Sequence, residues 1–183
     1  MKEEKNPPLI HDLLYLLTIP QIGPGRIRRL FHAFSSVEEI MKAPIQNIVR
    51  IEGIDRKLAE HIKRGGQHAI VDQQLKLLHK HQVQYVTIWD KAYPALLKRI
   101  SDAPLVLFYK GGFKESHQKA IAVVGMRSPS NYGKTVTAEL VRQLVMNDIT
   151  IVSGMARGVD SIAHHTALQS GGETLAVLSC GMD

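Results

Sequence analysis

The residues that most directly suggest chemistry form a small-residue turn between a buried apolar run and a helix. Ser153 and Gly154 end the run, Arg157 and Gly158 lie in the turn, and Asp160 follows as the helix begins. Backbone N–H groups at a helix N-terminus attract anions, and the arginine fork suits bidentate contact with phosphate. The pattern therefore predicts a phosphate-binding turn.

A second turn of the same kind follows an earlier apolar run. Its candidate ligand-binding residues are Gly125, Arg127, Ser128, Ser130, Tyr132 and Gly133. Glycines let a ligand approach the backbone closely, and serine hydroxyls add hydrogen-bond donors. One alternative is that either arginine pairs with a carboxylate such as Asp160. Because arginines recur in two glycine turns, phosphate binding is the favoured interpretation.

Short apolar runs and helical segments alternate around these turns. The predicted strands cover residues 120–124, 150–152 and 174–178, and the predicted helices cover 133–146 and 158–169. Continuous apolar strands separated by helices indicate a parallel sheet that is buried on both faces. We therefore expect an α/β fold, a Rossmann-like parallel sheet with helices on both faces. Ligands bind such sheets beyond the carboxyl ends of the strands, which is where both turns lie.

The first 80 residues have helical periodicity instead. Two similar elements, 22–30 and 51–59, each place a glycine turn before a basic amphipathic helix. This pattern resembles paired helix-hairpin-helix elements, which hold a phosphate backbone without reading sequence. The alternative is a small helical bundle whose glycines only make turns. We expect a helical domain over residues 1–80, of sterile-alpha-motif or helix-hairpin-helix type, and part of a Rossmann-like domain over 81–183, whose first strands cover 83–89 and 105–109.

Composition limits the class of protein. The 183 residues are 44% hydrophobic, which suffices for a core, and carry a net charge of +6, which suits a polyanionic partner. The single cysteine, Cys180, excludes an internal disulfide, and the charged N-terminus lacks an apolar signal region. We expect a cytoplasmic protein with no membrane partner. Aromatic residues are 5% of the chain, so phosphate contacts should outweigh base stacking.

Several motifs of nucleotide enzymes are incomplete. Gly133, Lys134 and Thr135 end like a Walker A loop, but Ser128 stands where that loop needs its first glycine. No Gly-x-Gly-x-x-Gly follows the strand at 120–124, so no dinucleotide cofactor is expected. Asp160 and His164 are four residues apart, and a structural contact is favoured over an acid–base pair. No catalytic set and no metal-ligand spacing emerge from these residues, and ATP hydrolysis is not expected.

Taken together, the motifs resemble the DNA-processing protein A family, also called Smf. The resemblance rests on four ordered segments, 125–133, 153–164, 171–178 and 181–183, and on a lead-in that begins at Tyr93-Pro94. The family pattern continues beyond Gly181 and Asp183. We therefore expect this chain to be truncated within the Rossmann-like domain, or to be completed by another chain.

The resemblance implies a function that the residues alone do not supply. Members of the family bind single-stranded DNA, help to load the recombinase RecA during natural transformation, and form homodimers through the Rossmann-like domain. They are not known as enzymes and need no cofactor. The resemblance assigns DNA or phosphate binding to the following residues: Gly125, Arg127, Ser128, Ser130, Tyr132, Gly133, Ser153, Gly154, Arg157 and Gly158.

Two other functions stay open at this point. One is a nucleotide-binding enzyme of phosphoribohydrolase type, which shares a related Rossmann-like fold. Such enzymes carry a Pro-Gly-Gly-x-Gly-Thr loop, which the chain lacks. The other is a protein–protein module formed by the helical domain.

Overall fold

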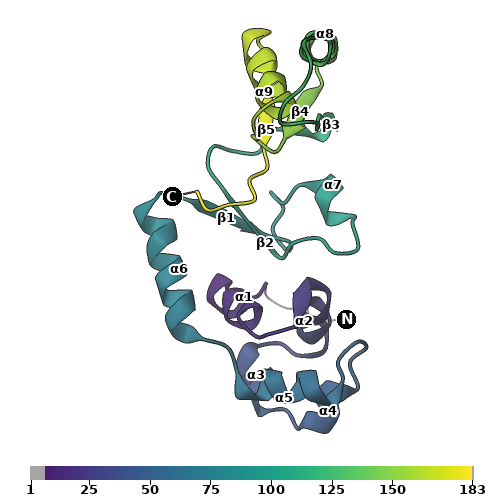
Figure 1. Ribbon diagram of the computed structural model, residues 1–183. Coiled ribbons are helices and arrows are strands. Elements are labelled where there is room, and N and C mark those ends of the chain that lie inside the picture. Colours follow the sequence, from purple (N-terminus) through teal and green to yellow (C-terminus); the bar gives the residue numbers. More distant parts are fainter. Residues whose placement is uncertain (1–6, 183) are drawn as a thin grey trace. The chain divides into compact units, whose positions relative to one another are not determined.

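The computed structural model describes residues 7–182, apart from the side chain of Ser116. The chain divides into two compact units between Gly111 and Gly112. Figure 1 shows the order of their elements along the chain. The expected boundary between residues 80 and 81 falls inside the first unit, because the strands before Gly111 group with the helices.

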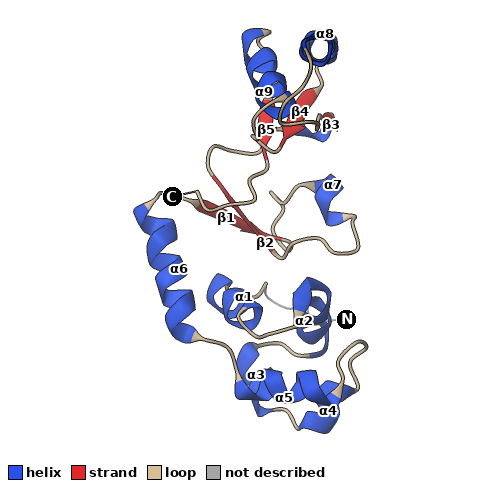
Figure 2. Cartoon of the chain, viewed as in Figure 1, coloured by secondary structure: helices blue, strands red, loops and turns tan. Residues whose placement is uncertain are grey.

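The first unit begins with helices and ends with a strand pair (Figure 2). Its helices are α1 (Ile10–Leu17), α2 (Gly23–Ala33), α3 (Val37–Lys42), α4 (Ile45–Val49), α5 (Arg56–Arg64), α6 (His68–Lys80) and α7 (Ala95–Lys98). Strands β1 (Gln84–Thr87) and β2 (Val106–Tyr109) pair in antiparallel fashion. The helical core contains fully buried aliphatic side chains, among them Leu13, Ile27, Leu30, Ile48 and Ile62.

The two predicted hairpins lie against each other at their turns. Arg26 Nε donates to the carbonyl oxygen of Gly53 at 2.6 Å, and Arg29 Nη1 donates to that of Glu52 at 3.2 Å. Gly53 has φ +79°, a conformation that favours glycine. Two basic residues of the first hairpin therefore hold the turn of the second. In the second hairpin, the Asp55 carboxylate caps α5 by accepting from the Leu58 N–H at 2.7 Å.

The strand pair and the helices of the first unit share an aromatic contact. The rings of Phe31 and Trp89 meet edge to face, with centroids 6.0 Å apart. Tyr93 is buried and its hydroxyl donates to the carbonyl oxygen of Pro104 at 2.7 Å. Burial raises the pKa of Tyr93, which keeps this hydroxyl protonated as a donor.

The second unit is built around a parallel sheet. A short 3-10 helix, η1 (Glu115–Gln118), leads into β3 (Ala120–Ala122), α8 (Asn131–Met146), β4 (Thr150–Ser153), α9 (Val159–Gln169) and β5 (Thr174–Ala176). The strands lie in the order β3-β4-β5, and both pairs are parallel. The predicted α/β alternation and parallel sheet are therefore confirmed.

Helices α8 and α9 cover one face of this sheet rather than both. The three strands lie side by side in chain order, so successive crossovers of the same hand place both helices on the same face. The two helices pack against each other and against β4 (Figure 1). Among the described residues, the expected second helical layer is not found. The core beneath the helices contains Val123, Val141, Ile151, Ala163 and Ala167.

This one-sided core makes a prediction about the stability of the second unit. Ile151 lies on the central strand and is fully buried, so Ile151→Ala should cost about 2–5 kcal/mol of unfolding free energy. Ile121 lies on the adjacent strand and is 43% exposed, so Ile121→Ala should cost less than about 1 kcal/mol. Amide hydrogen exchange within the second unit measures both. Equal losses would contradict the placement of the core at the central strand rather than at its neighbour.

Candidate nucleic-acid interface

Three loops leave the carboxyl ends of the parallel strands. The first loop, 123–130, joins β3 to α8, and the second loop, 154–158, joins β4 to α9. The third loop, 177–182, follows β5. The hydrogen-bond ladder continues into them, because Val123 N donates to Val152 O and Val177 N donates to Ser153 O, each at 2.9 Å. The three loops therefore start side by side, and all ten predicted site residues lie at this edge or next to it.

The first two loops interlock through their backbones. Gly158 has φ +87°, and a Cβ atom there would lie 2.3 Å from the carbonyl oxygen of Met126. The N–H of Val159 donates to that same oxygen at 3.1 Å. A Cβ atom on Gly125 would in turn lie 2.7 Å from Val159 Cγ2. The close packing of the two loops therefore requires glycine at both positions. The contacts that Met126 and Val159 make in this packing were not predicted from the sequence.

Two polar residues of the second turn face inward. Ser153 is 3% exposed, and its hydroxyl donates to the carbonyl oxygen of Val123 at 2.7 Å. Asp160 is 7% exposed, and its Oδ2 accepts from the Ala156 N–H at 3.3 Å. A Cβ atom on Gly154 would approach the same Oδ2 to 3.0 Å. The Ser153 hydroxyl and the Asp160 carboxylate thus hold strand and loop in place.

The N-terminus of α9 is also satisfied by the protein itself. The N–H of Val159 is bonded to Met126, and the N–H of Ser161 donates to the carbonyl oxygen of Ala156 at 3.1 Å. The expectation that free N–H groups of this helix hold an anion is therefore wrong for these two donors. Among the side chains of the second loop, the exposed Arg157 is the one that carries a positive charge.

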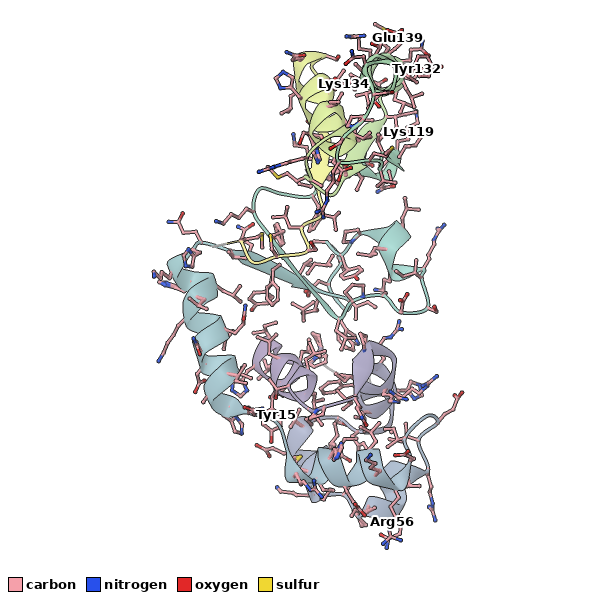
Figure 3. All side chains as sticks on the ribbon, viewed as in Figure 1. Tyr15, Arg56, Lys119, Tyr132, Lys134 and Glu139 are labelled. Carbon is pink, nitrogen blue, oxygen red and sulfur yellow. The ribbon has the colours of Figure 1, made fainter. Side chains whose placement is uncertain are left out.

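The start of α8 carries several predicted site residues. Ser130 caps the helix, because its Oγ accepts from the N–H of Gly133 at 3.1 Å. Two residues after Ser130, Tyr132 is 80% exposed, and Lys134 is exposed on the same first turn (Figure 3). Ser130 therefore orients the helix, while Tyr132 offers a ring to solvent. Ser128 is exposed on the loop before the cap.

Arg127 and Arg157 are the exposed cations of the interlocked loops. Among the ion pairs of residues 7–182, neither arginine has a carboxylate partner. The alternative, an ion pair of an arginine with Asp160, is not formed. The Asp160 carboxylate is buried and accepts a hydrogen bond from the Ala156 N–H instead. Charges at this edge are therefore positive toward solvent, with Lys134 nearby on α8.

The predicted contact of Asp160 with His164 is replaced by another. The Thr174 hydroxyl donates to the carbonyl oxygen of Ile151 at 2.9 Å, so His164 Nδ1, 2.6 Å away, donates to that hydroxyl. His164 thus ties α9 to β5, which agrees with a structural role.

An ion pair lies just before β5. Lys114 Nζ donates to the Glu173 carboxylate at 2.7 Å and lowers the pKa of that carboxyl.

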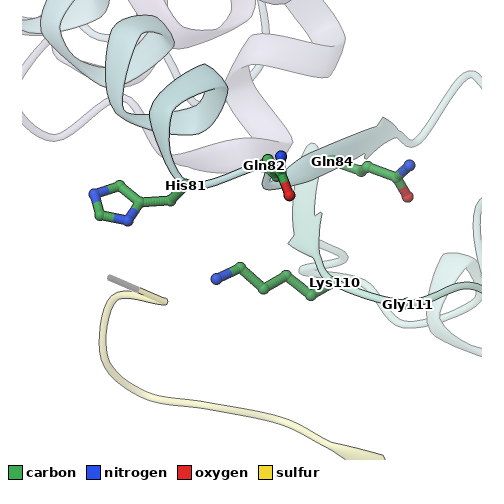
Figure 4. Close-up of a pocket in the computed structure, with 5 residues that line it drawn as sticks. All are labelled: His81, Gln82, Gln84, Lys110 and Gly111. Atoms are coloured by element: carbon green, nitrogen blue, oxygen red, sulfur yellow. The ribbon is translucent and has the colours of Figure 1, made fainter.

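A separate hollow lies in the first unit. Its volume is about 310 Å³ and its lining is polar: His81, Gln82, Gln84, Lys110 and Gly111 (Figure 4). None of the predicted site residues lines it.

Of the third turn, Asp183 lies outside the described residues, and Cys180 is exposed. Within residues 7–182 the helices are too short or too polar to span a bilayer.

Two family models match separate parts of the chain. The model of the DNA recombination-mediator protein A family matches residues 84–183, and that of a SAM-like helix-hairpin-helix tandem matches residues 13–65. The second match confirms the predicted hairpin pair. The two matches lie on either side of residue 80, and the exact domain boundary stays a prediction.

Individual relatives point in the same direction. The chain is 34% identical to Protein Smf of Synechocystis over 88% of its length, and 45% identical to the DNA processing protein DprA of Streptococcus pneumoniae over 53%. The chain spans 42% and 34% of those two proteins.

The crystal structure of DNA processing protein A from Streptococcus pneumoniae is also similar. The TM-score is 0.70 at 28% identity, over 96% of this chain and 59% of that one. The family model covers more than half of the chain, including both interlocked loops. The chain therefore belongs to the DNA recombination-mediator protein A family, the DprA/Smf proteins.

Proposed function

We propose that the carboxyl edge of the parallel sheet binds single-stranded DNA through its phosphates. The observation that carries the proposal is the pair of exposed arginines, Arg127 and Arg157, on two loops that lock together through Gly158 and Met126. Two guanidinium groups carried by interlocked backbone loops suit a ligand whose anionic groups repeat. Single-stranded DNA is such a ligand, and the family to which the chain belongs mediates DNA recombination.

The ten predicted residues divide into two roles. Gly125, Gly154, Gly158, Ser130 and Ser153 shape the loops through the contacts described above. Arg127, Arg157, Ser128 and Tyr132 face solvent, and we assign direct contact with DNA to these four. Gly133 supports this surface, since its N–H completes the cap of α8.

The wider role follows from the family resemblance. We propose that the whole protein loads RecA onto single strands during natural transformation, acts as a homodimer in the cytoplasm, and works as a binding protein rather than an enzyme. Recombinase assembly on a single strand, measured with and without the protein, tests this role. Release of free base from a nucleotide would instead favour the phosphoribohydrolase hypothesis.

The arginines give the first test of the DNA site. Arg127→Ala and Arg157→Ala should each weaken binding of an oligothymidylate roughly tenfold, because each removes a charged hydrogen-bond donor. Each should also lower the slope of log affinity against log salt by about 0.7. Fluorescence anisotropy of the full chain measures both quantities.

Arg142→Ala is the matched control for this test. Arg142 lies further along α8, is half exposed, and pairs with Glu139 at 3.0 Å. Its loss should leave affinity unchanged within about twofold. Binding that is insensitive to Arg127 and Arg157, or equally sensitive to all three arginines, would show that the site lies elsewhere.

The interlocked loops give the second test. Gly158→Ala forces a methyl group onto Met126 and Arg127 at a positive φ, so it should cost about 2–4 kcal/mol of stability in the second unit. It should also weaken DNA binding. Gly171→Ala shares the positive φ, +75°, but meets nothing within 4 Å, so it should cost only about 1–2 kcal/mol and spare binding. Amide exchange measures the stability of each variant, and anisotropy measures its affinity for DNA. Equal effects of the two substitutions on DNA affinity would show that the contact between the two loops does not support binding.

A further inference from the structure

Large apolar side chains are exposed beside the two arginines. Val124 is 75% exposed, Met126 71%, Met155 63% and Val177 64%. They follow the ends of β3, β4 and β5, so each loop of the carboxyl edge contributes at least one. We call these four residues the apolar shelf. Such a group of exposed apolar side chains on one edge marks a contact surface.

The strand register places the shelf on neighbouring positions. Ala122 pairs with Val152, which pairs with Leu175, so two residues further along the ladder Val124, Gly154 and Val177 stand side by side. The bond from Val177 N to Ser153 O shows that the ladder reaches this far. Met126 and Met155 lie just beyond, each within two residues of an arginine of the same loop. Both loops therefore carry an apolar side chain close in sequence to an exposed arginine.

The backbone at Met155 adds to this argument. Met155 has φ +57°, a conformation in which a side chain with Cβ is disfavoured. The flanking Gly154 packs against the Asp160 carboxylate, which fixes the loop at this point. The loop thus exposes a long, flexible apolar side chain to water. No burial of that side chain offsets the cost of the disfavoured backbone conformation.

We infer that the apolar shelf contacts the bases of the bound single strand while Arg127 and Arg157 contact its phosphates. The inference rests on the DNA-binding function proposed above and names the groups that recognise an unpaired strand. Bases of a single strand expose apolar ring faces, whereas a duplex buries them in its stack. Methionine side chains pack well on aromatic rings. The shelf therefore supplies base contacts that the low aromatic content of the chain does not.

The test compares DNA with and without bases. The variant carries Met126→Ser and Met155→Asn, since asparagine tolerates the positive φ of residue 155. Anisotropy of the full chain is measured with an oligothymidylate, an abasic oligonucleotide of equal length, and a duplex. The double variant should bind the oligothymidylate about five- to tenfold more weakly, and the abasic strand within about twofold of the parent chain.

Met146→Ser is the matched control. Met146 is 78% exposed at the other end of α8, so its loss should leave all three affinities unchanged. Equal losses on the oligothymidylate and the abasic strand, or no loss on either, would overturn the inference, while the proposal that the parent chain binds phosphates would stand. A parent chain that binds no oligothymidylate at low salt would refute the proposed function itself.

Discussion

The contact of Gly158 with the backbone of Met126 and Arg127 is the constraint on which the candidate site depends. It lets the N–H of Val159 reach the Met126 carbonyl, so the start of α9 is anchored to the loop before α8. Two segments about thirty positions apart in sequence are thereby fixed as one surface. Without this contact, Arg127 and Arg157 would lie on two independent loops, and each would lose side-chain and backbone entropy separately on binding.

The interior of the second unit is arranged to support that surface. The Ser153 hydroxyl ties the end of β4 to the end of β3, and the buried Asp160 carboxylate closes the second loop on Ala156. His164 and Thr174 connect α9 with β5 and β4. The Asp160 carboxylate, considered above as a partner of the arginines, is thus engaged inside the fold. Neither guanidinium group takes part in an ion pair among residues 7–182, so both stay available to a ligand.

Local patterns in the sequence were enough to predict the strands and α-helices of the second unit. Strands β3, β4 and β5 and helices α8 and α9 lie within two residues of their predicted bounds, because short apolar runs and glycine turns are local signals. The direction of the Ser153 hydroxyl, the partner of His164 and the use of the α9 N–H groups could not be predicted. Each depends on a residue distant in sequence, respectively Val123, Thr174 and Met126. The second helical layer was expected from a general rule, yet it depends on strand order, which local patterns do not specify.

The most direct measurement of the central claim is amide hydrogen exchange of the full chain with and without an oligothymidylate. If the carboxyl edge of the sheet binds the strand, exchange should slow in the first loop, 123–130, and the second loop, 154–158, and at the start of α8. The helices of the first unit, α1 to α6, should exchange as before. Slowing confined to those helices, with the two loops unchanged, would contradict the account.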